Sequence, residues 1–373
     1  MDMDIPASEK MRRPCERLAI SAVVPLVVSL AMVSCRGPEG ASLETSAEGE
    51  RPRPANPAEI ATAAFVSEAT GQEDANPLDA DRAYGYLKQI CDLGPRPTGS
   101  PGMLAQQKLL VDHFQALGGE VLFQKFQMRH PRTGKATPVA NLVVQWHPDR
   151  KERIVLCAHY DTRPQPDNQQ VSKRQRGTVF IGANDGGSGT ALLMELGHHI
   201  PSLENTAVGV DFVFFDAEEF IFNLGPRLDN YFVGSTYFAK KYVSQPRDFS
   251  YRWGVLFDMV GDKQLQIFQE RNSWWWRDTR PLVKSIWATA KKLEVHEFVA
   301  RRKHEVQDDH VPLRNIGKIP SCNIIDFDYP KWPKNAYWHT EADTLDKCSG
   351  ESLAKVGWVI LVWLEGLEPS EPE

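Results

Sequence analysis

Cysteine is scarce in this chain, and its spacing argues against a metal site built from thiolates. The sequence has 373 residues and six cysteines, and no two of them form a Cys-x-x-Cys pair, the spacing typical of cysteine ligands to zinc. Four cysteines follow the N-terminal region: Cys91, Cys157, Cys322 and Cys348. Buried free thiols and a disulfide are both compatible with an exported protein of this composition.

The chain also lacks a long basic block, an internal repeat and a second domain boundary. Its formal net charge is -6, so a nucleic-acid partner is not expected. Hydrophobic residues make up 42% of the chain and charged residues 25%, which is the composition of an ordinary globular protein. We therefore expect one large folded domain.

The long uncharged run at the N-terminus is too short to be a membrane span. Three arginines within residues 12–17 precede the run 18–33, and Pro25 interrupts that run. Charged, then apolar, then small residues are the order of a secretory signal. We predict a signal peptide over 1–35 and export, to the periplasm or out of the cell. Cys35 is either a lipidated lipobox cysteine, which would anchor the protein to a membrane, or an incidental residue of a plainly cleaved signal.

Residues 36–77 contain few large apolar side chains and are rich in Ala, Glu, Pro, Ser and Gly. A segment of this composition cannot bury enough apolar surface to fold alone. We predict a flexible linker over 36–77 and a folded domain over 78–373.

The remaining sequence alternates helix and strand patterns. Apolar residues recur at helical spacing over 104–117, and two glycines follow. Continuous apolar runs at 154–158, 212–215 and 255–257 suit strands buried on both faces. The further expected elements are strands at 121–126 and 139–146 and helices at 190–199, 235–242, 281–293 and 351–364. This alternation predicts a single-domain, three-layer α/β/α sandwich with a mixed, largely parallel central sheet.

Acidic residues and histidines directly follow the three apolar runs. His159 and Asp161 follow the first run, Glu218 and Glu219 the second, and Asp258 the third. Ligands of such folds bind beyond the carboxyl ends of the strands, and carboxylate oxygens with imidazole nitrogens are suitable zinc ligands. A single Asp after a strand is more often a turn former or a helix cap. Several such sites together predict a metal centre.

The adjacent pair Glu218-Glu219 needs its own explanation, because neighbouring residues in a strand point to opposite faces. The backbone turns at a strand end, so both carboxylates can border one cleft at different angles. We therefore predict that one of the two binds metal while the other transfers protons. Phe214 and Phe215 stand shortly before the pair, which argues against the alternative of a solvated surface position.

A series of motifs follows a familiar order between residues 83 and 364. The motifs are Leu93-Gly94-Pro95-Arg96, His159-Tyr160-Asp161-Thr162-Arg163-Pro164, Gly182-Ala183-Asn184-Asp185-Gly186-Gly187-Ser188-Gly189, Phe214-Phe215-Asp216-Ala217-Glu218-Glu219, Asp258-Met259-Val260-Gly261, Asp308-Asp309-His310-Val311-Pro312 and Trp338-His339-Thr340. In this order they resemble the zinc-dependent peptidase family M28 and, within it, the bacterial-type glutaminyl-peptide cyclotransferases, or glutaminyl cyclases. The fold that the resemblance implies is that of the M28 zinc aminopeptidases, with 78–373 as the catalytic domain.

The resemblance assigns roles to residues at matching positions. Asp185, Glu219 and His339 are similar to the ligands of the catalytic zinc, and Glu218 is similar to the acid/base. Asp258 matches a carboxylate that lies beside the substrate amine in cyclases.

A second group of residues separates two readings of the family. His159 matches a ligand of the second zinc in two-zinc aminopeptidases, so His159, Asp161 and Asp258 are expected either to hold a second metal or to support the ligands of the first. Asp308 is similar to the second cyclase carboxylate beside the substrate amine, at a position where aminopeptidases of the family commonly carry Ser. We expect Asp308 to hydrogen-bond Asp258 and to draw it away from metal.

The expected substrate pocket matches the cyclases only in part. Trp338 directly precedes the histidine ligand, as it does in cyclases, where an aromatic wall encloses the glutamine side chain; ordinary core packing is the alternative. Animal cyclases also carry a Trp shortly after the paired glutamates, whereas this chain has Phe220, Phe222 and Leu224 there. This departure leaves the wall of the pocket undefined.

The activity that the resemblance implies is the zinc-dependent cyclisation of the N-terminal glutamine of peptides or proteins to pyroglutamate, with release of ammonia. Glu218 would take a proton from the attacking α-amine and deliver it to the departing ammonia. The alternative is a zinc aminopeptidase, in which Glu218 would activate water instead. One Zn²⁺ per chain is expected for the cyclase and two for the aminopeptidase.

Overall fold

A computed structural model describes residues 75–167, 178–203, 207–225, 227–330 and 336–369, which belong to one compact unit. The predicted signal peptide over 1–35 lies outside these residues, as does the predicted linker except for its last three residues. One of these, Asn76, donates a hydrogen bond from Nδ2 to the carbonyl of Ala354 at 3.2 Å. Within the described ranges, no helix has the length and apolar character to cross a membrane.

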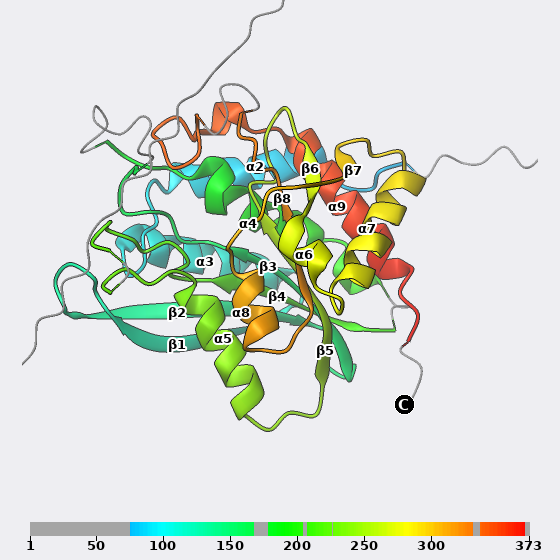
Figure 1. Ribbon diagram of the computed structural model, residues 1–373, viewed down its shortest axis with the longest axis horizontal. Coiled ribbons are helices and arrows are strands. Elements are labelled where there is room, and N and C mark those ends of the chain that lie inside the picture. The colour runs from blue at the N-terminus through cyan, green and yellow to red at the C-terminus, as the bar shows by residue number, and fades with distance from the viewer. Residues whose placement is uncertain (1–74, 168–177, 204–206, 226, 331–335, 370–373) are drawn as a thin grey trace, which may run out of the picture. The chain divides into compact units, whose positions relative to one another are not determined.

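A six-stranded mixed sheet forms the centre of the molecule (Figure 1), with strand order β1-β2-β4-β3-β5-β8. The strands are β1 (Glu120–Arg129), β2 (Ala136–Trp146), β3 (Glu152–His159), β4 (Gly209–Phe215), β5 (Ser250–Asp258) and β8 (Ser321–Ile325). β4, β3, β5 and β8 pair in parallel, whereas β2 is antiparallel to both of its neighbours. All strands except β2 therefore run in the same direction.

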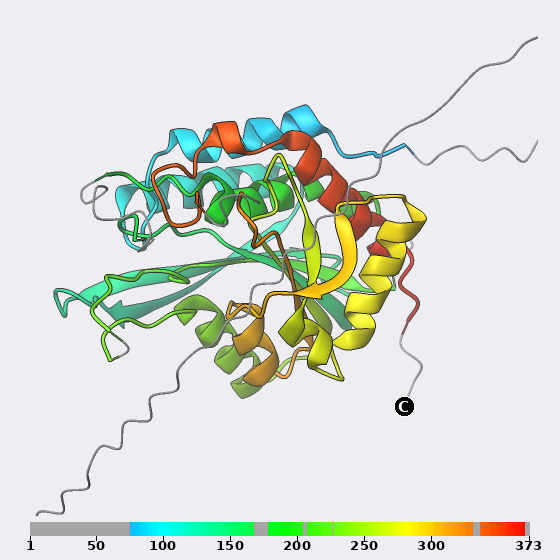
Figure 2. The same cartoon turned by 45° about the horizontal axis from the view of Figure 1, so that its top comes forward.

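Helices cover both faces of this sheet (Figure 2). One face carries α2 (Ala80–Asp92), α3 (Pro101–Ala116), α4 (Gly189–Leu196) and α9 (Gly350–Glu365), and the other carries α5 (Val233–Ser244) and α8 (His310–Asn315). A smaller group of elements adjoins β8: β6 (Ile267–Glu270), α6 (Arg271–Trp275), α7 (Arg280–Lys292) and β7 (Phe298–Lys303). The arrangement confirms the predicted three-layer α/β/α fold.

Alternate residues of the central strands supply two separate cores. In β3, Ile154 and Leu156 pack into the core on the α4 side, while Val155 and Cys157 pack into the core on the α5 side. All seven residues of β4 are buried. Burial on both faces explains why these strands are continuous apolar runs rather than alternating ones.

The predicted helix over 190–199 is too long at its C-terminal end. α4 stops at Leu196, where Gly197 is the C-cap and the backbone tightens into a short 3₁₀ turn at Ile200–Ser202. Six further α-helices and strands were not predicted from the sequence: α2, β6, α6, β7, α8 and β8.

Candidate functional site

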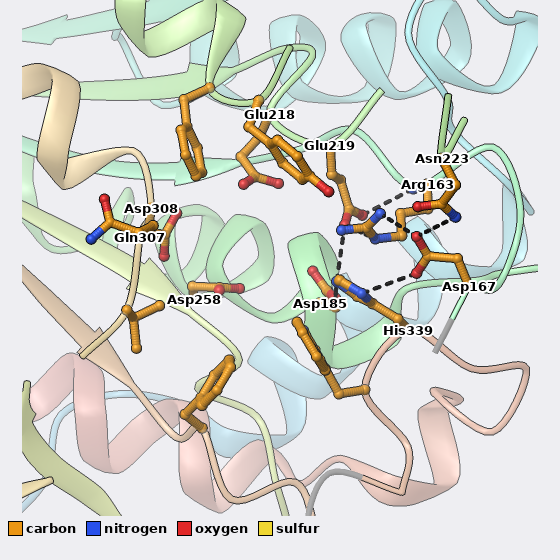
Figure 3. A pocket seen from close by; sticks show the side chains of 15 residues that line it. Arg163, Asp167, Asp185, Glu218, Glu219, Asn223, Asp258, Gln307, Asp308 and His339 are labelled. Atoms are coloured by element: carbon orange, nitrogen blue, oxygen red, sulfur yellow. Dashed lines mark hydrogen bonds and ion pairs between the residues drawn. The ribbon is translucent and has the colours of Figure 1, made fainter. Parts of the chain in front are cut away.

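A cavity of about 580 Å³ opens beyond the carboxyl ends of β4 and β5. Figure 3 shows two groups of polar side chains around it, with Asp185 between them. Glu218, Asp258 and Asp308 form one group, which we call the acid side. Glu219, His339, Arg163, Asp167 and Asn223 form the other, which we call the metal side.

The three proposed zinc ligands meet on the metal side. His339 Nε2 lies 3.5 Å from Asp185 Oδ2 and 3.5 Å from Glu219 Oε2. Glu219 follows β4, His339 lies in the loop before α9, and Asp185 precedes α4. Possible ligand atoms from three separate segments thus lie close together at His339, as a protein metal site requires.

The loop that carries Asp185 depends on a glycine. Gly186 has φ +79°, and a Cβ on it would lie 2.8 Å from the carbonyl oxygen of Asp161 and 3.0 Å from the ring of His159. Only glycine allows this close approach without displacing its neighbours. The Asp343 carboxylate holds the same loop by accepting hydrogen bonds from the backbone N–H groups of Asn184 and Asp185.

His159 and Asp258 lie on the opposite side of Asp185. His159 Nε2 is 3.2 Å from Asp185 Oδ1 and 3.4 Å from Asp258 Oδ1. His159, Asp185 and Glu219 also offer ligand atoms that all lie within 4.8 Å of one another. Asp185 is therefore shared between two sets of metal-type ligands.

Several buried atoms at this centre fit a bound cation. Asp185 Oδ2, Asp258 Oδ1 and His159 Nδ1 are buried without a hydrogen-bond partner among the described residues. A buried polar atom without a hydrogen bond is costly, and coordination of a metal by the two carboxylate oxygens would reduce that cost. The set of oxygen and nitrogen donors suits zinc.

The pKa values of the two histidines of the centre shift in opposite directions. Burial and the nearby charge of Arg163 lower the pKa of His339 to about 4, so its ring is neutral at pH 7 and can act as a ligand. Burial alone would lower the pKa of His159, but contacts with Asp161, Asp185 and Asp258 outweigh burial and raise that pKa well above its usual value.

Asp161 holds the turn that presents the paired glutamates. Its two carboxylate oxygens accept hydrogen bonds from the backbone N–H groups of Glu218 at 3.0 Å and Glu219 at 3.2 Å. Ala217 adopts a left-handed conformation with φ 57° at this turn, and both glutamates reach the cavity. Asp161 is fully buried, so it supports the backbone of the two glutamates from the interior of the protein.

The acid side favours protonated carboxyl groups. Burial raises the pKa of Glu218 well above its usual value, and the charges of Glu219 and Asp308 add to this shift against the opposing effect of His159. Burial, followed by the charges of Asp308 and Asp185, raises the pKa of Asp258 to about 7, although His159 opposes the shift. A group that titrates near neutral pH, as Asp258 does, suits proton transfer.

The expected hydrogen bond between Asp308 and Asp258 is not present in the described part of the chain. The Asp308 carboxylate instead accepts from Asn323 Nδ2 and from the backbone N–H of Asp309, both at 2.7 Å. These two donors satisfy its oxygens from the side of β8 and α8. Asp308 therefore acts on Asp258 through its charge, and Asp258 stays within 3.4 Å of His159.

The aromatic wall combines Trp338, which the sequence indicated, with three residues that it did not. Trp338 lines the cavity and stacks on the ring of His339 at a centroid distance of 3.8 Å. Tyr231, Phe232 and Phe327 complete the wall. Phe220 and Phe222, which stand near the position of the missing Trp, instead pack against each other and the ring of His130.

Arg163 and Asp167 are the other site residues without an assigned role. They lie in the segment after β3, Arg163 within the His-Tyr-Asp-Thr-Arg-Pro motif and Asp167 four residues later. Both line the cavity, and their side chains form an ion pair of 2.8 Å. Their charges and their position beside a metal-ligand motif are the features of the sequence that could have identified them as site residues.

Comparison with known proteins identifies related chains. The model of peptidase family M28 matches residues 141–364. A curated glutaminyl-peptide cyclotransferase of Gloydius blomhoffii is 24% identical over 327 residues, which cover 80% of this chain and 83% of the relative.

Solved structures show the same relationship with higher identity. The crystal structure of Fimbriiglobus ruber glutaminyl cyclase has 39% sequence identity and a TM-score of 0.72, and the match covers 78% of this chain and 96% of that one. A leucine aminopeptidase precursor from Bacteroides thetaiotaomicron has 28% identity and a TM-score of 0.70, with 78% and 98% covered. The fold is thus shared by chains named for both activities, with the higher identity to the cyclase.

Proposed function

This chain belongs to peptidase family M28, and we propose that within the family it is a glutaminyl-peptide cyclotransferase. It would convert the N-terminal glutamine of peptides or proteins to pyroglutamate and release ammonia. The observation that carries this proposal is the acid side of the cavity. Glu218, Asp258 and Asp308 face the cavity away from the His339 ring, where they can receive an α-ammonium group while a glutamine side chain reaches toward Asp185 and His339.

The metal side would hold one zinc ion through Asp185, Glu219 and His339. When bound, zinc supplies Lewis acidity toward an amide carbonyl group. Arg163 is the single Lys or Arg among the described residues that line the cavity, whereas six Asp and Glu residues line it, and this excess of acidic groups favours a divalent cation.

The chain's own residues would carry out the proton transfers. Asp258 and Asp308 hold the α-amine, and Glu218 accepts one of its protons as the nitrogen bonds to the side-chain amide carbon. The bond between that carbon and the amide nitrogen then breaks. Glu218 returns the proton to this nitrogen, which leaves as ammonia. The ring closes without consumption of water. The aromatic wall that includes Trp338 and Phe327 excludes competing water from the reacting amide.

A second candidate is the aminopeptidase, because His159 and Asp258 complete a second set of metal-type ligands around Asp185. That activity would use two zinc ions and a water activated by Glu218. The 39% identity to a solved glutaminyl cyclase over nearly its whole length favours the cyclase. The charge of Asp308 beside Asp258 also favours it, because this charge raises the pKa of Asp258 and so opposes its ionisation.

Export remains part of the proposal and rests on the N-terminal sequence alone. We propose that residues 1–35 direct the protein to the periplasm or the outside of the cell, where peptides with N-terminal glutamine are its partners. Membrane attachment would occur only through lipidation of Cys35. Mass spectrometry of the mature N-terminus would distinguish a lipidated Cys35 from a plain cleavage.

The test of the activity is a side-by-side assay with fluorogenic glutaminyl and leucyl peptides. The purified protein should convert the glutaminyl peptide to a product lighter by one ammonia, as read by mass spectrometry, and leave the leucyl peptide intact. Release of free leucine, with no cyclised product, would instead establish the aminopeptidase. Glu218→Gln serves as the control, because it keeps the shape of the side chain and removes the proton carrier.

A further inference from the structure

His339 and Glu219 reach the metal side from different loops, yet each is contacted by one member of an ion pair: Glu219 by Arg163 and His339 by Asp167. Arg163 and Asp167 are four residues apart in the segment after β3. We call them the bracing pair. Figure 3 shows the pair beside His339 and Glu219, on the side away from Asp258 and Asp308.

Arg163 holds both oxygens of the Glu219 carboxylate. Its backbone N–H donates to Glu219 Oε1 at 2.9 Å, and its guanidinium Nε lies 2.8 Å from Glu219 Oε2. The arginine is 4% exposed, so its charge acts on Glu219 with little screening by water. The hydrogen bond to Oε1 and the guanidinium charge beside Oε2 together restrict the rotation of this carboxylate and favour one direction of Oε2 toward the metal site.

Asp167 holds His339 at the ring and at the backbone. Asp167 Oδ1 lies 3.2 Å from His339 Nδ1, and the Asp167 N–H donates to the His339 carbonyl at 3.0 Å. The other carboxylate oxygen, Oδ2, accepts from Arg163 at 2.8 Å and from Asn223 Nδ2 at 3.0 Å. The aspartate is therefore itself held in place from two sides.

The backbone contact has a specific function, because His339 adopts a left-handed conformation with φ 56°. A non-glycine residue in this region costs of the order of 1 kcal/mol or more and persists only where its surroundings enforce it. The hydrogen bond from Asp167 is one such constraint. The carboxylate of Asp167 beside Nδ1 favours a proton on that nitrogen, which leaves the lone pair of Nε2 directed at Asp185 and Glu219.

We propose that Asp167 and Arg163 are positioning residues that set the affinity and the geometry of the zinc site by fixing His339 and Glu219 before metal binds. This inference rests on the zinc site of the proposed function and extends it to residues that do not contact the metal themselves. A ligand set fixed in advance loses less conformational entropy on binding than a mobile one. Removal of such supporting groups typically weakens metal binding about 10–100-fold.

The test compares Asp167→Asn and Asp167→Ala with Asp112→Asn in the full-length protein. Asp112 pairs with Lys108 on α3 at the same i,i+4 spacing, but both residues are on the surface. Zinc affinity is measured by competition with a chromophoric chelator, and the visible spectrum of the cobalt-substituted protein reports ligand geometry. Thermal unfolding of the metal-free proteins shows whether each variant is folded.

We expect Asp167→Ala to weaken zinc binding about 10–100-fold and to change the cobalt spectrum. Asp167→Asn should have a smaller effect, because its side-chain oxygen can still accept the proton on His339 Nδ1 while the charge opposite Arg163 is lost. Asp112→Asn should match the unmodified protein. Zinc affinities and cobalt spectra of both Asp167 variants equal to those of Asp112→Asn would overturn the proposal.

Arg163→Lys tests the other half of the pair. Lysine keeps the charge but has one nitrogen in place of the guanidinium plane, so it cannot contact Glu219 and Asp167 with the same geometry. We expect weaker zinc binding and a changed cobalt spectrum with unchanged unfolding temperature. Because these readouts do not involve turnover, an enzyme without cyclase activity would contradict the proposed function and leave this test intact.

Discussion

Asp185 and Asp258 are the same type of residue, both lie within 3.4 Å of His159 Nε2, and yet their pKa values shift in opposite directions. Burial would raise both pKa values. At Asp185, the two histidines and Arg163 outweigh burial and lower the pKa. At Asp258, the charges of Asp308 and Asp185 add to burial, and the pKa rises to about 7.

The difference teaches that the neighbours beyond the shared histidine decide the chemistry of each carboxylate. Asp185 is kept ionised, as a metal ligand must be. Asp258 lies among like charges, which favour a proton or a cationic substrate group beside it. One cavity thus holds a side suited to a metal ion and a side suited to an amine.

The largest expected effect comes from the metal side. His339→Ala removes one of three proposed ligands, so zinc should be lost and cyclisation should fall to background. Folding should survive, because the buried strands β3 and β4 do not contact the metal site except at their ends. Elemental analysis and circular dichroism measure the two properties. Normal zinc content in this variant would exclude His339 as a ligand.

The paired glutamates should respond differently to the same substitution. Glu218→Gln keeps zinc but removes the proton carrier, so turnover should fall about 10²–10⁴-fold. Glu219→Gln should weaken zinc binding, and excess zinc should restore part of its activity. Zinc content and kcat are measured on both variants. Loss of zinc from Glu218→Gln but not from Glu219→Gln would show that Glu218 is the zinc ligand and Glu219 the proton carrier.

Asp161→Asn should have an intermediate effect on both sides. The Asn side chain has only one oxygen to accept from the backbone N–H groups of Glu218 and Glu219, so the turn between them loses part of its support. We expect about a 10–100-fold loss of activity together with weaker zinc binding. Unchanged kcat and zinc affinity would show that the turn does not depend on this carboxylate.

The smallest expected effect is a change of pH dependence on the acid side. Asp308→Asn removes a negative charge that helps to raise the pKa of Asp258, so Asp258 should lose its proton at lower pH. The acidic limb of the kcat/KM profile should therefore move to lower pH, by about one unit for a nearby like charge. A limb that stays in place or moves to higher pH would show that Asp258 does not control it.

The sequence was sufficient to predict the centre of the fold and many of the residues that line the cavity. β3 and β4 each contain an uninterrupted apolar run, at 154–158 and 212–215, because they are buried on both faces. The ends of these runs could be recognised in the sequence, and with them His159 and the paired glutamates. β8 was missed because it has five residues and includes Ser321 and Asn323, whose polarity is compensated by tertiary contacts. Asn323, for example, donates to Asp308.

Contacts between distant segments could not be predicted from local patterns. Asp167 and His339 are 172 positions apart, and no periodicity or motif joins them. The same holds for Tyr231 and Phe232 in the pocket wall, because a hydrogen bond from Phe232 N–H to the Glu218 carbonyl brings that segment back to the site. The expected Asp308–Asp258 hydrogen bond was wrong because β8 supplies a better donor to Asp308 than a second carboxylate can.

The central claim, that the metal side holds one zinc while the acid side receives the substrate amine, is tested most directly by zinc content and specificity measured on one sample. Elemental analysis of the active protein should give one zinc per chain, with turnover of the glutaminyl peptide only. Two tightly bound zinc ions with turnover of the leucyl peptide would contradict the account and assign His159 and Asp258 to a second metal.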